Sequence, residues 1–188
     1  WMQKLPGGLI HVNVVGCALF AAISGSSAAT VATVGKMSIP ELRKRKYPEK
    51  ILLGSLAGSG TLGLLIPPSI ILIIYGVTVQ ESIAKLFIAG IIPGIMIALI
   101  FMSYVIIWSL INKKIMPKAN ETYSLFEKIK RSKQLLPVIL LILGVIGSIY
   151  TGIATATEAA SLGVVGALIL SYFQNSLSVK TFKKSLLG

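Results

Sequence analysis

Residues 58–69, Gly58-Ser59-Gly60-Thr61-Leu62-Gly63-Leu64-Leu65-Ile66-Pro67-Pro68-Ser69, interrupt an apolar stretch that extends from residue 51 to residue 79. Glycine adopts backbone conformations that end a helix, and proline lacks the N–H donor that a helix needs. The residue before a proline is also biased away from helical geometry. Because a helix cannot continue smoothly through both features, we predict a broken helix over residues 51–79, with an extended segment over residues 58–68 between its two halves.

The preceding apolar stretch, within residues 9–40, is interrupted as well. Its two apolar halves are separated by small and polar residues, namely Ser24, Gly25, Ser26, Ser27 and Thr30. In hydrocarbon an unpartnered backbone group costs several kcal/mol, so such a break must be buried in protein or line a wet cavity. Each half is also too short to cross a bilayer core of about 30 Å at roughly 1.5 Å per residue. We predict a re-entrant helical hairpin with its tip at residues 24–30; the alternative is one spanning helix whose small residues allow close packing.

The composition favours a membrane protein over a soluble one. Of the 188 residues, 54% are hydrophobic and 13% are charged, whereas soluble domains carry roughly 25% charged residues. A membrane helix needs about 20 mostly apolar residues, and residues 86–111 meet this requirement in one segment. We predict an all-α, polytopic integral membrane protein whose residues 1–188 form a single membrane domain, internal to a longer protein.

The last apolar stretch, residues 135–174, is too long for one span and divides near residues 151–158. Thr157 is the predicted N-cap of its second helix, with Glu158 in the first turn, where a negative charge is favourable. We predict two closely spaced spans, residues 135–151 and 158–174. A second re-entrant hairpin is the alternative.

The net charge of +12 is concentrated in alternate connections. Residues 36–50 contain six basic and two acidic side chains, residues 113–133 contain seven basic and two acidic ones, and residues 80–85 are neutral overall. This distribution is typical of cytoplasmic loops under the positive-inside rule. Few aromatic residues lie among these lysines and arginines, which argues against nucleic-acid binding. We expect the basic segments to contact anionic membrane lipids, and residues 113–133 to be a cytoplasmic connection whose amphipathic helix presents Leu125, Phe126 and Ile129.

Two motifs that suggest enzymes are better explained otherwise. Gly58-x-Gly60-x-x-Gly63 matches the dinucleotide-binding fingerprint, but that motif needs a preceding strand, and a proline pair stands where its helix should run. Ser24 and His11 could belong to a hydrolase, yet His11 is the only histidine and no aspartate lies in an apolar stretch. Cys17 is the single cysteine, so neither a disulfide within the chain nor a cysteine–histidine metal cluster can form. We therefore predict that the protein is not an enzyme.

The residues of the two breaks suit an alkali cation better. Broken membrane helices present free carbonyl and N–H groups at the ends of their halves. Carbonyl and hydroxyl oxygens are the hard ligands that such a cation needs once its water is removed. The serines and threonine of residues 24–30 supply hydroxyls, and residues 58–68 supply carbonyls. Two breaks in consecutive apolar segments are typical of a transporter's central site; the alternative is that the glycines serve only close packing.

Short motifs occur along almost the whole chain in a characteristic order: AISGSSAAT at residues 22–30, VGK at 34–36, IP at 39–40, GLLIPPSI at 63–70, GIIPG at 90–94, and Gly152 followed by TEAA at 157–160. Together they resemble the large membrane subunit of tripartite ATP-independent periplasmic (TRAP) transporters. The resemblance implies an ion-transporter-like elevator fold of two inverted repeats. It also implies sodium-driven uptake of a small carboxylate-type organic acid at the bacterial inner membrane, with a small membrane subunit and a periplasmic substrate-binding protein as partners.

The resemblance further implies a sodium site, with Na⁺ as the coupling ion and no bound cofactor. In the family, one sodium ion lies between the hairpin tip and the unwound segment. Carried onto this sequence, its ligands are Ser24, Ser26, Gly63, Ile66 and Pro68, of which Gly63 and Ile66 can offer only backbone carbonyls. The implied vicinity of the substrate and the ion comprises Gly25, Ser27, Thr30, Gly58, Ser59, Gly60, Thr61 and Pro67. The alternative function is a membrane channel or a non-transporting scaffold subunit.

The charge distribution yields a prediction of topology. Residues 36–50, 113–133 and 180–184 should face the cytoplasm and residues 80–85 the periplasm. A cysteine introduced by Ser82→Cys should react with a membrane-impermeant thiol reagent in intact cells, whereas one introduced by Lys46→Cys should not. The opposite labelling pattern would show that the orientation is wrong.

Overall fold

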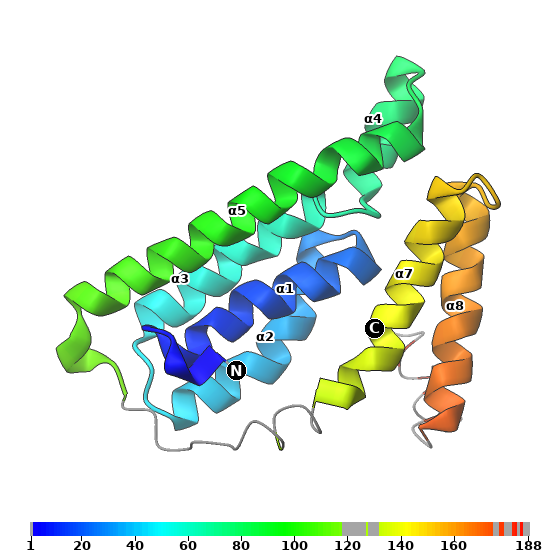
Figure 1. Cartoon of the computed structure of the whole chain (residues 1–188). Helices are drawn as coiled ribbons and strands as arrows, with labels where there is room; N and C mark the ends of the chain where they lie inside the picture. Colours follow the sequence, from blue (N-terminus) through cyan, green and yellow to red (C-terminus); the bar gives the residue numbers. More distant parts are fainter. Residues whose placement is uncertain are drawn as a thin grey trace. The chain divides into compact units, whose positions relative to one another are not determined.

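The computed structural model describes residues 2–117, 127, 132–174, 177, 178, 182, 183 and 185 (Figure 1). Over these residues the regular structure is entirely helical, which confirms the predicted all-α class. The chain divides into two compact units, Trp1–Ser124 and Leu125–Gly188. The predicted amphipathic helix with Leu125, Phe126 and Ile129 lies outside the described residues, as do Lys180 and Lys184 of the last basic segment.

The first unit is built from α-helices and short 3₁₀ turns, of which η3 joins α3 to α4. The α-helices are α1 (His11–Ser24), α2 (Ser27–Lys44), α3 (Glu49–Gly60), α4 (Ile70–Val79) and α5 (Ile83–Ile111). The 3₁₀ turns are η1 (Met2–Lys4), η2 (Gly8–Ile10), η3 (Thr61–Leu64) and η4 (Lys113–Ile115). Helices α1, α2 and α3 pack against one another, and α5 lies along α3 and α1 (Figure 1).

Helices α1 and α2 form a helical hairpin whose break is shorter than predicted. Only Gly25 and Ser26 lie between them, because Ser26 adopts an extended backbone and caps α2, so that the helix restarts at Ser27. Helix α2 then continues through Pro40 to Lys44, so most of the basic segment is helical rather than a loop. The basic residues of its last turn favour this extension, since they oppose the negative end of the helix dipole.

The broken helix is present, but its unwound segment begins later than predicted. Residues 58–60 belong to the last turn of α3, and η3 follows directly before the chain unwinds and α4 begins at Ile70. Tertiary packing explains why these glycines stay helical. A Cβ atom on Gly58 would lie 3.2 Å from the ring of Phe101, and one on Gly60 would overlap the side chain of Val31.

Clusters of buried side chains connect the helices within the described part of the first unit. One joins Ile10, Leu42, Ile51, Leu52 and Val105, a second joins Val14, Ala21 and Leu62, and a third joins Cys17, Val34 and Leu56. Cys17 is therefore a packing residue between α1, α2 and α3, as its apolar surroundings in the sequence suggest.

The outer surface of α5 is strongly apolar. This helix has 29 residues. Its most apolar 18-residue segment has a mean hydropathy of 2.5, and 17% of that segment is buried within the protein. Together with α8 (Ala156–Phe173), it is one of two described helices that are long and apolar enough to cross a membrane. Large side chains such as Ile92 and Ile111 remain mostly exposed. Such a surface suits contact with lipid.

The second unit contains an antiparallel pair of helices, α7 (Leu136–Tyr150), preceded by η5 (Lys133–Leu135), and α8. The predicted N-cap Thr157 is wrong: Thr155 caps α8, and its hydroxyl accepts the Glu158 N–H while the Glu158 carboxylate accepts the Thr155 N–H at 2.8 Å. This reciprocal capping box needs a spacing of three residues, which Thr155 has and Thr157 lacks. With 15 residues α7 is shorter than a usual span, so the choice between two spans and a hairpin stays a prediction.

Two glycines of α3 provide a matched test of packing. Gly60→Ala would place a methyl group against Val31 and should destabilise the protein by about 1–3 kcal/mol. Gly54→Ala has nothing within 4 Å of the added methyl, and its better helix propensity should leave stability unchanged or raise it by up to about 1 kcal/mol. Thermal unfolding in detergent measures both variants. Equal melting temperatures would contradict this account of the α2–α3 contact.

Candidate functional site: the hairpin tip and the unwound segment

The tip of the α1–α2 hairpin is a sharp turn made by two residues. Gly25 has φ 59° and ψ 11°, the left-handed conformation that ends many helices, and its N–H donates to the Ala21 carbonyl at 2.9 Å. Ser26 follows in an extended conformation, and its hydroxyl accepts the Ala29 N–H at 3.4 Å. Glycine is required at position 25, because a side chain there would be strained and would meet the Pro68 carbonyl oxygen.

A small hydroxyl network holds the tip together. The Ser26 carbonyl accepts hydrogen bonds from the Thr30 hydroxyl at 2.7 Å, from the Thr30 N–H at 3.0 Å and from the Ser24 hydroxyl at 3.3 Å. The Ser24 and Thr30 hydroxyls lie 3.0 Å apart, so the single Ser24 proton is shared between the Thr30 hydroxyl and the Ser26 carbonyl. Oxygen atoms of three residues thus converge on one side of the turn. The Ser26 oxygen in this group is its carbonyl, since its hydroxyl serves as the helix cap.

The unwound segment between η3 and α4 leaves carbonyl groups without helical partners. The Leu62 carbonyl accepts two N–H groups, from Leu65 and Ile66, and the Leu64 carbonyl accepts the Ser69 hydroxyl at 2.8 Å. Within the described part of the chain, neither the Ile66 nor the Pro68 carbonyl accepts a hydrogen bond. The Pro67–Pro68 peptide is cis. These carbonyls are therefore available to a ligand.

The two breaks meet through backbone contacts. A Cβ atom on Gly63 would lie 2.9 Å from both the Ser26 carbonyl carbon and the Ser27 nitrogen, so η3 rests directly on that peptide. The Ile70 N–H at the start of α4 donates to the Gly25 carbonyl at 3.3 Å. The breaks pack as neighbours, as expected for segments joined by a short connection.

A buried hydroxyl lies at this junction. The Ser27 Oγ is almost inaccessible to solvent and has no hydrogen-bond partner among the described residues. Buried polar atoms are nearly always satisfied, so an unpartnered hydroxyl on the residue whose peptide meets Gly63 fits a site that takes a cation or water. This oxygen joins those of Ser24 and Thr30 as a possible ligand at the tip.

The structure gathers some of the residues implicated by the sequence and separates others. The residues of the hairpin tip are Ser24, Gly25, Ser26, Ser27 and Thr30. Ile66, Pro67 and Pro68 lie in the unwound segment, and Gly63 lies in η3 directly before it. Gly58 and Gly60 serve helix packing, and the exposed Thr61 donates to the Gly58 carbonyl at 2.7 Å. Ser59 is buried, and its hydroxyl donates to the Ser55 carbonyl at 2.5 Å, with the Asn13 and Leu56 carbonyls farther away at 3.3 and 3.4 Å. These four residues support the site from α3 and η3.

Three supporting residues escaped the sequence analysis. Asn13, buried in α1, donates to the Leu52 carbonyl at 3.1 Å and to the Ser55 hydroxyl at 3.0 Å, which ties the hairpin to α3. A lone amide in an apolar helix is a signal for such a buried hydrogen bond. Gly90 and Gly94 belong to the GIIPG motif. A Cβ on Gly90 would lie 2.7 Å from the Leu65 carbonyl oxygen, and one on Gly94 would lie 3.0 Å from Ile66. They let α5 approach the unwound segment closely.

The enzyme-like motifs find no support in this geometry. His11 and Ser24 stand at opposite ends of α1, about 20 Å apart at roughly 1.5 Å per residue. The His11 Nε2 pairs with the Pro6 carbonyl at 2.8 Å, and the Ser24 hydroxyl is engaged at the tip. The glycine fingerprint crosses the boundary of α3 and η3 and follows no strand. Neither hydrolase nor dinucleotide chemistry is assembled here.

Comparison with known proteins identifies the family of the chain. The family described as "Tripartite ATP-independent periplasmic transporter, DctM component" matches residues 3–188. The chain belongs to this family. The match confirms the resemblance drawn from the motifs.

Relatives of this DctM-family chain carry transporter names. It is 41% identical to the C4-dicarboxylate TRAP transporter large permease protein DctM of Pseudomonas aeruginosa, over 90% of this chain and 39% of the relative. It is 38% identical to the ectoine/5-hydroxyectoine TRAP transporter large permease protein UehC of Ruegeria pomeroyi, over 90% and 39%. It is also 38% identical to the sialic acid TRAP transporter permease protein SiaT of Haemophilus influenzae, over 95% and 29%.

This member of the DctM family therefore spans less than half the length of the curated relatives it matches. Those relatives are permease subunits of transporters, which confirms the prediction that the chain is not an enzyme.

The hydroxyl network yields a test at the hairpin tip. Thr30→Val keeps the shape of the side chain and removes the hydroxyl that links Ser24 to the Ser26 carbonyl. Loss of a hydrogen bond of about 1 kcal/mol should speed hydrogen exchange of the tip amides roughly fivefold. Thr78→Val, which removes an exposed hydroxyl bonded to the Ile74 carbonyl in α4, should leave those amides unchanged. Hydrogen exchange of the tip amides is measured by mass spectrometry. Identical exchange rates in Thr30→Val and Thr78→Val would refute the role of the hydroxyl network.

Proposed function

We propose that the chain forms part of the large membrane subunit of a sodium-coupled secondary transporter that imports a small organic acid. The observation that carries this proposal is the backbone contact of Gly63 with the Ser26–Ser27 peptide, which brings hairpin hydroxyls and unwound carbonyls together. Buried hydroxyls and free carbonyls are the groups with which proteins replace the water around an alkali cation.

The coupling ion would be held by oxygen atoms of both breaks. The hydroxyls of Ser24 and Ser26 and the carbonyls of Gly63, Ile66 and Pro68 are the proposed ligands. The Ser26 hydroxyl accepts the Ala29 N–H and keeps a second lone pair for the ion. Helix α1 ends at Ser24 and η3 ends at Leu64, so the negative ends of both elements point toward this junction. A sodium ion there would neutralise these carbonyl dipoles. It would enter as cargo from solution, and its concentration gradient would drive uptake.

An anionic substrate group would find a complementary field beside the ion. Helices α2 and α4 begin at Ser27 and Ile70, and the hydrogen bond between Gly25 and Ile70 brings these two beginnings close together. The N-terminal ends of helices carry partial positive charge and bind carboxylates readily. Transporters commonly use half-helix ends in this way. The C4-dicarboxylate and sialic acid named for two relatives are organic acids, which supports this substrate class.

The remaining features of the proposal follow from family membership. We propose that the α1–α2 hairpin is re-entrant and moves as part of an elevator domain in the bacterial inner membrane. A small membrane subunit and a periplasmic substrate-binding protein would complete the transporter. The fused permease name DctMQ of the Oleidesulfovibrio alaskensis relative, to which the chain is 38% identical, supports a second membrane component. A channel would instead show downhill flux that needs no coupling ion.

The sodium site is tested by a pair of matched serines. Ser26 and Ser82 both cap a helix, each accepting a backbone N–H at 3.4 Å, but only Ser26 lies at the junction. In proteoliposomes containing the complete transporter, Ser26→Ala should raise the Na⁺ concentration for half-maximal uptake severalfold. Ser82→Ala should lose a comparable helix cap and keep the wild-type Na⁺ response. An unchanged Na⁺ response in Ser26→Ala would remove this residue from the ligand set, while uptake without Na⁺ would overturn sodium coupling itself.

A stronger perturbation of the same site is Gly63→Val. A β-branched side chain would meet the Ser26–Ser27 peptide and disfavour the required backbone shape. We expect this variant to lose Na⁺-dependent uptake more completely than Ser26→Ala.

A further inference from the structure

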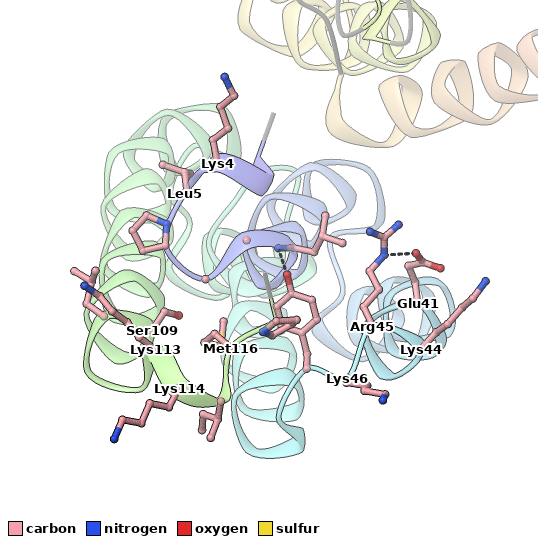
Figure 2. Close-up of a pocket in the computed structure, with 18 residues that line it drawn as sticks. Lys4, Leu5, Glu41, Lys44, Arg45, Lys46, Ser109, Lys113, Lys114 and Met116 are labelled. Atoms are coloured by element: carbon pink, nitrogen blue, oxygen red, sulfur yellow. Dashed lines mark hydrogen bonds and ion pairs between the residues drawn. The ribbon is translucent and has the colours of Figure 1, made fainter. Parts of the chain in front are cut away.

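A basic pocket lies at the end of the first unit that is remote from the hairpin tip. Its volume is about 1070 Å³, and its walls come from the segment before α1, the end of α2 with the connection that follows, and the end of α5 with η4 (Figure 2). The pocket and the tip are separated by the length of α1, about 20 Å at roughly 1.5 Å per residue. It is therefore distinct from the proposed sodium site.

The charge of the pocket is strongly positive. Its cationic lining residues are Lys4, Lys44, Arg45, Lys46, Lys113 and Lys114, and its one acidic residue is Glu41. The Arg45 guanidinium donates a hydrogen bond to the Glu41 carboxylate at 2.6 Å and holds the pKa of Glu41 below its usual range. Figure 2 shows Lys4, Lys46 and Lys114 around the rim, on different sides of the pocket. An anion would thus meet cationic groups from several directions.

Two hydroxyl groups on the walls can still donate hydrogen bonds. The Ser109 side chain is 3% exposed, and its hydroxyl has no partner among the residues that the structure describes. The Tyr47 hydroxyl accepts the Leu9 N–H at 3.0 Å, which leaves its own proton without an acceptor in the described part of the chain. Phosphate oxygens accept hydrogen bonds from such hydroxyls as well as from lysines.

Apolar side chains in the same lining suggest which anion binds. Leu5, Leu110 and Ile115 line the pocket and are 37%, 46% and 54% exposed. The pocket also opens beside the end of α5, whose outer face is apolar along its length. A small soluble anion would gain nothing from this surface, whereas an amphipathic anion could place its head among the lysines and its chains along α5.

We propose that this pocket binds the headgroup of a single anionic phospholipid. Its phosphate would lie among Lys46, Lys113 and Lys114, with the hydroxyls of Tyr47 and Ser109 as further donors and the acyl chains against α5. Such a site goes beyond both the transport function and a diffuse attraction of basic loops to the membrane. It would fasten the ends of α2 and α5 and the segment before α1 to the cytoplasmic leaflet.

Native mass spectrometry of the complete transporter in detergent, titrated with phosphatidylglycerol, tests the site. The double variant Lys46→Gln/Lys113→Gln removes two lining charges, and Lys36→Gln/Lys50→Gln removes two exposed charges of the same basic region that do not line the pocket. We expect the pocket variant to bind its tightest phosphatidylglycerol roughly thirtyfold more weakly, and the control variant to match the wild type. Unchanged melting temperatures without added lipid show that both variants fold.

Two results would overturn the proposal. Equal weakening in the pocket and control variants would mean that only the general charge of the surface matters. Displacement of the lipid by an equal concentration of inorganic phosphate or glycerol 3-phosphate would mean that the pocket takes a soluble phosphate. Retention of phosphatidylglycerol against both competitors, with loss in the pocket variant alone, supports a lipid site.

Discussion

The contact between Gly63 and the Ser26–Ser27 peptide is the constraint on which the rest of the first unit depends. It joins the tip of a helical hairpin to the 3₁₀ turn that precedes the unwound segment of a broken helix. In a membrane such breaks are tolerated only when each satisfies the other or encloses polar ligands. The hydrogen bond from Ile70 to Gly25 and the packing of Gly90 and Gly94 against the unwound segment complete this arrangement. The breaks therefore stabilise one another, and the polar atoms that they leave over form the candidate site.

Much of this arrangement could be predicted from the residues themselves. The Pro67-Pro68 pair and the serines around Gly25 break a helix in any surroundings, because their effects on the backbone are local. The position where α3 ends was not predictable in this way. Gly58 and Gly60 favour a break by their own propensity, but the close approach of Phe101 and Val31 requires them inside a helix. Tertiary packing overrode local preference at these positions.

Other features depend on partners far along the chain and leave only faint traces in the sequence. The Asn13 side chain reaches Leu52 and Ser55, and no spacing within α1 indicates these partners. The basic pocket combines residues from the beginning, middle and end of the first unit, so its lysines look in sequence like ordinary loop charges. By contrast, the capping box of Thr155 and Glu158 follows a local rule of spacing. The prediction of Thr157 as the N-cap was wrong because it placed the start of the helix two residues too late.

The contact between Gly63 and the Ser26–Ser27 peptide is made by backbone atoms, and under the proposed function this bears on substrate selectivity. Peptide groups are the same whichever residue carries them, so a contact of this kind can hold the two breaks in place but cannot encode a preference for one organic molecule over another. The relatives are named for C4-dicarboxylates, ectoines and sialic acid, so the named substrates differ within the family. Under the proposed function, selectivity for one substrate would reside in side chains around this contact and in other parts of the transporter. The backbone contact itself would be independent of the substrate.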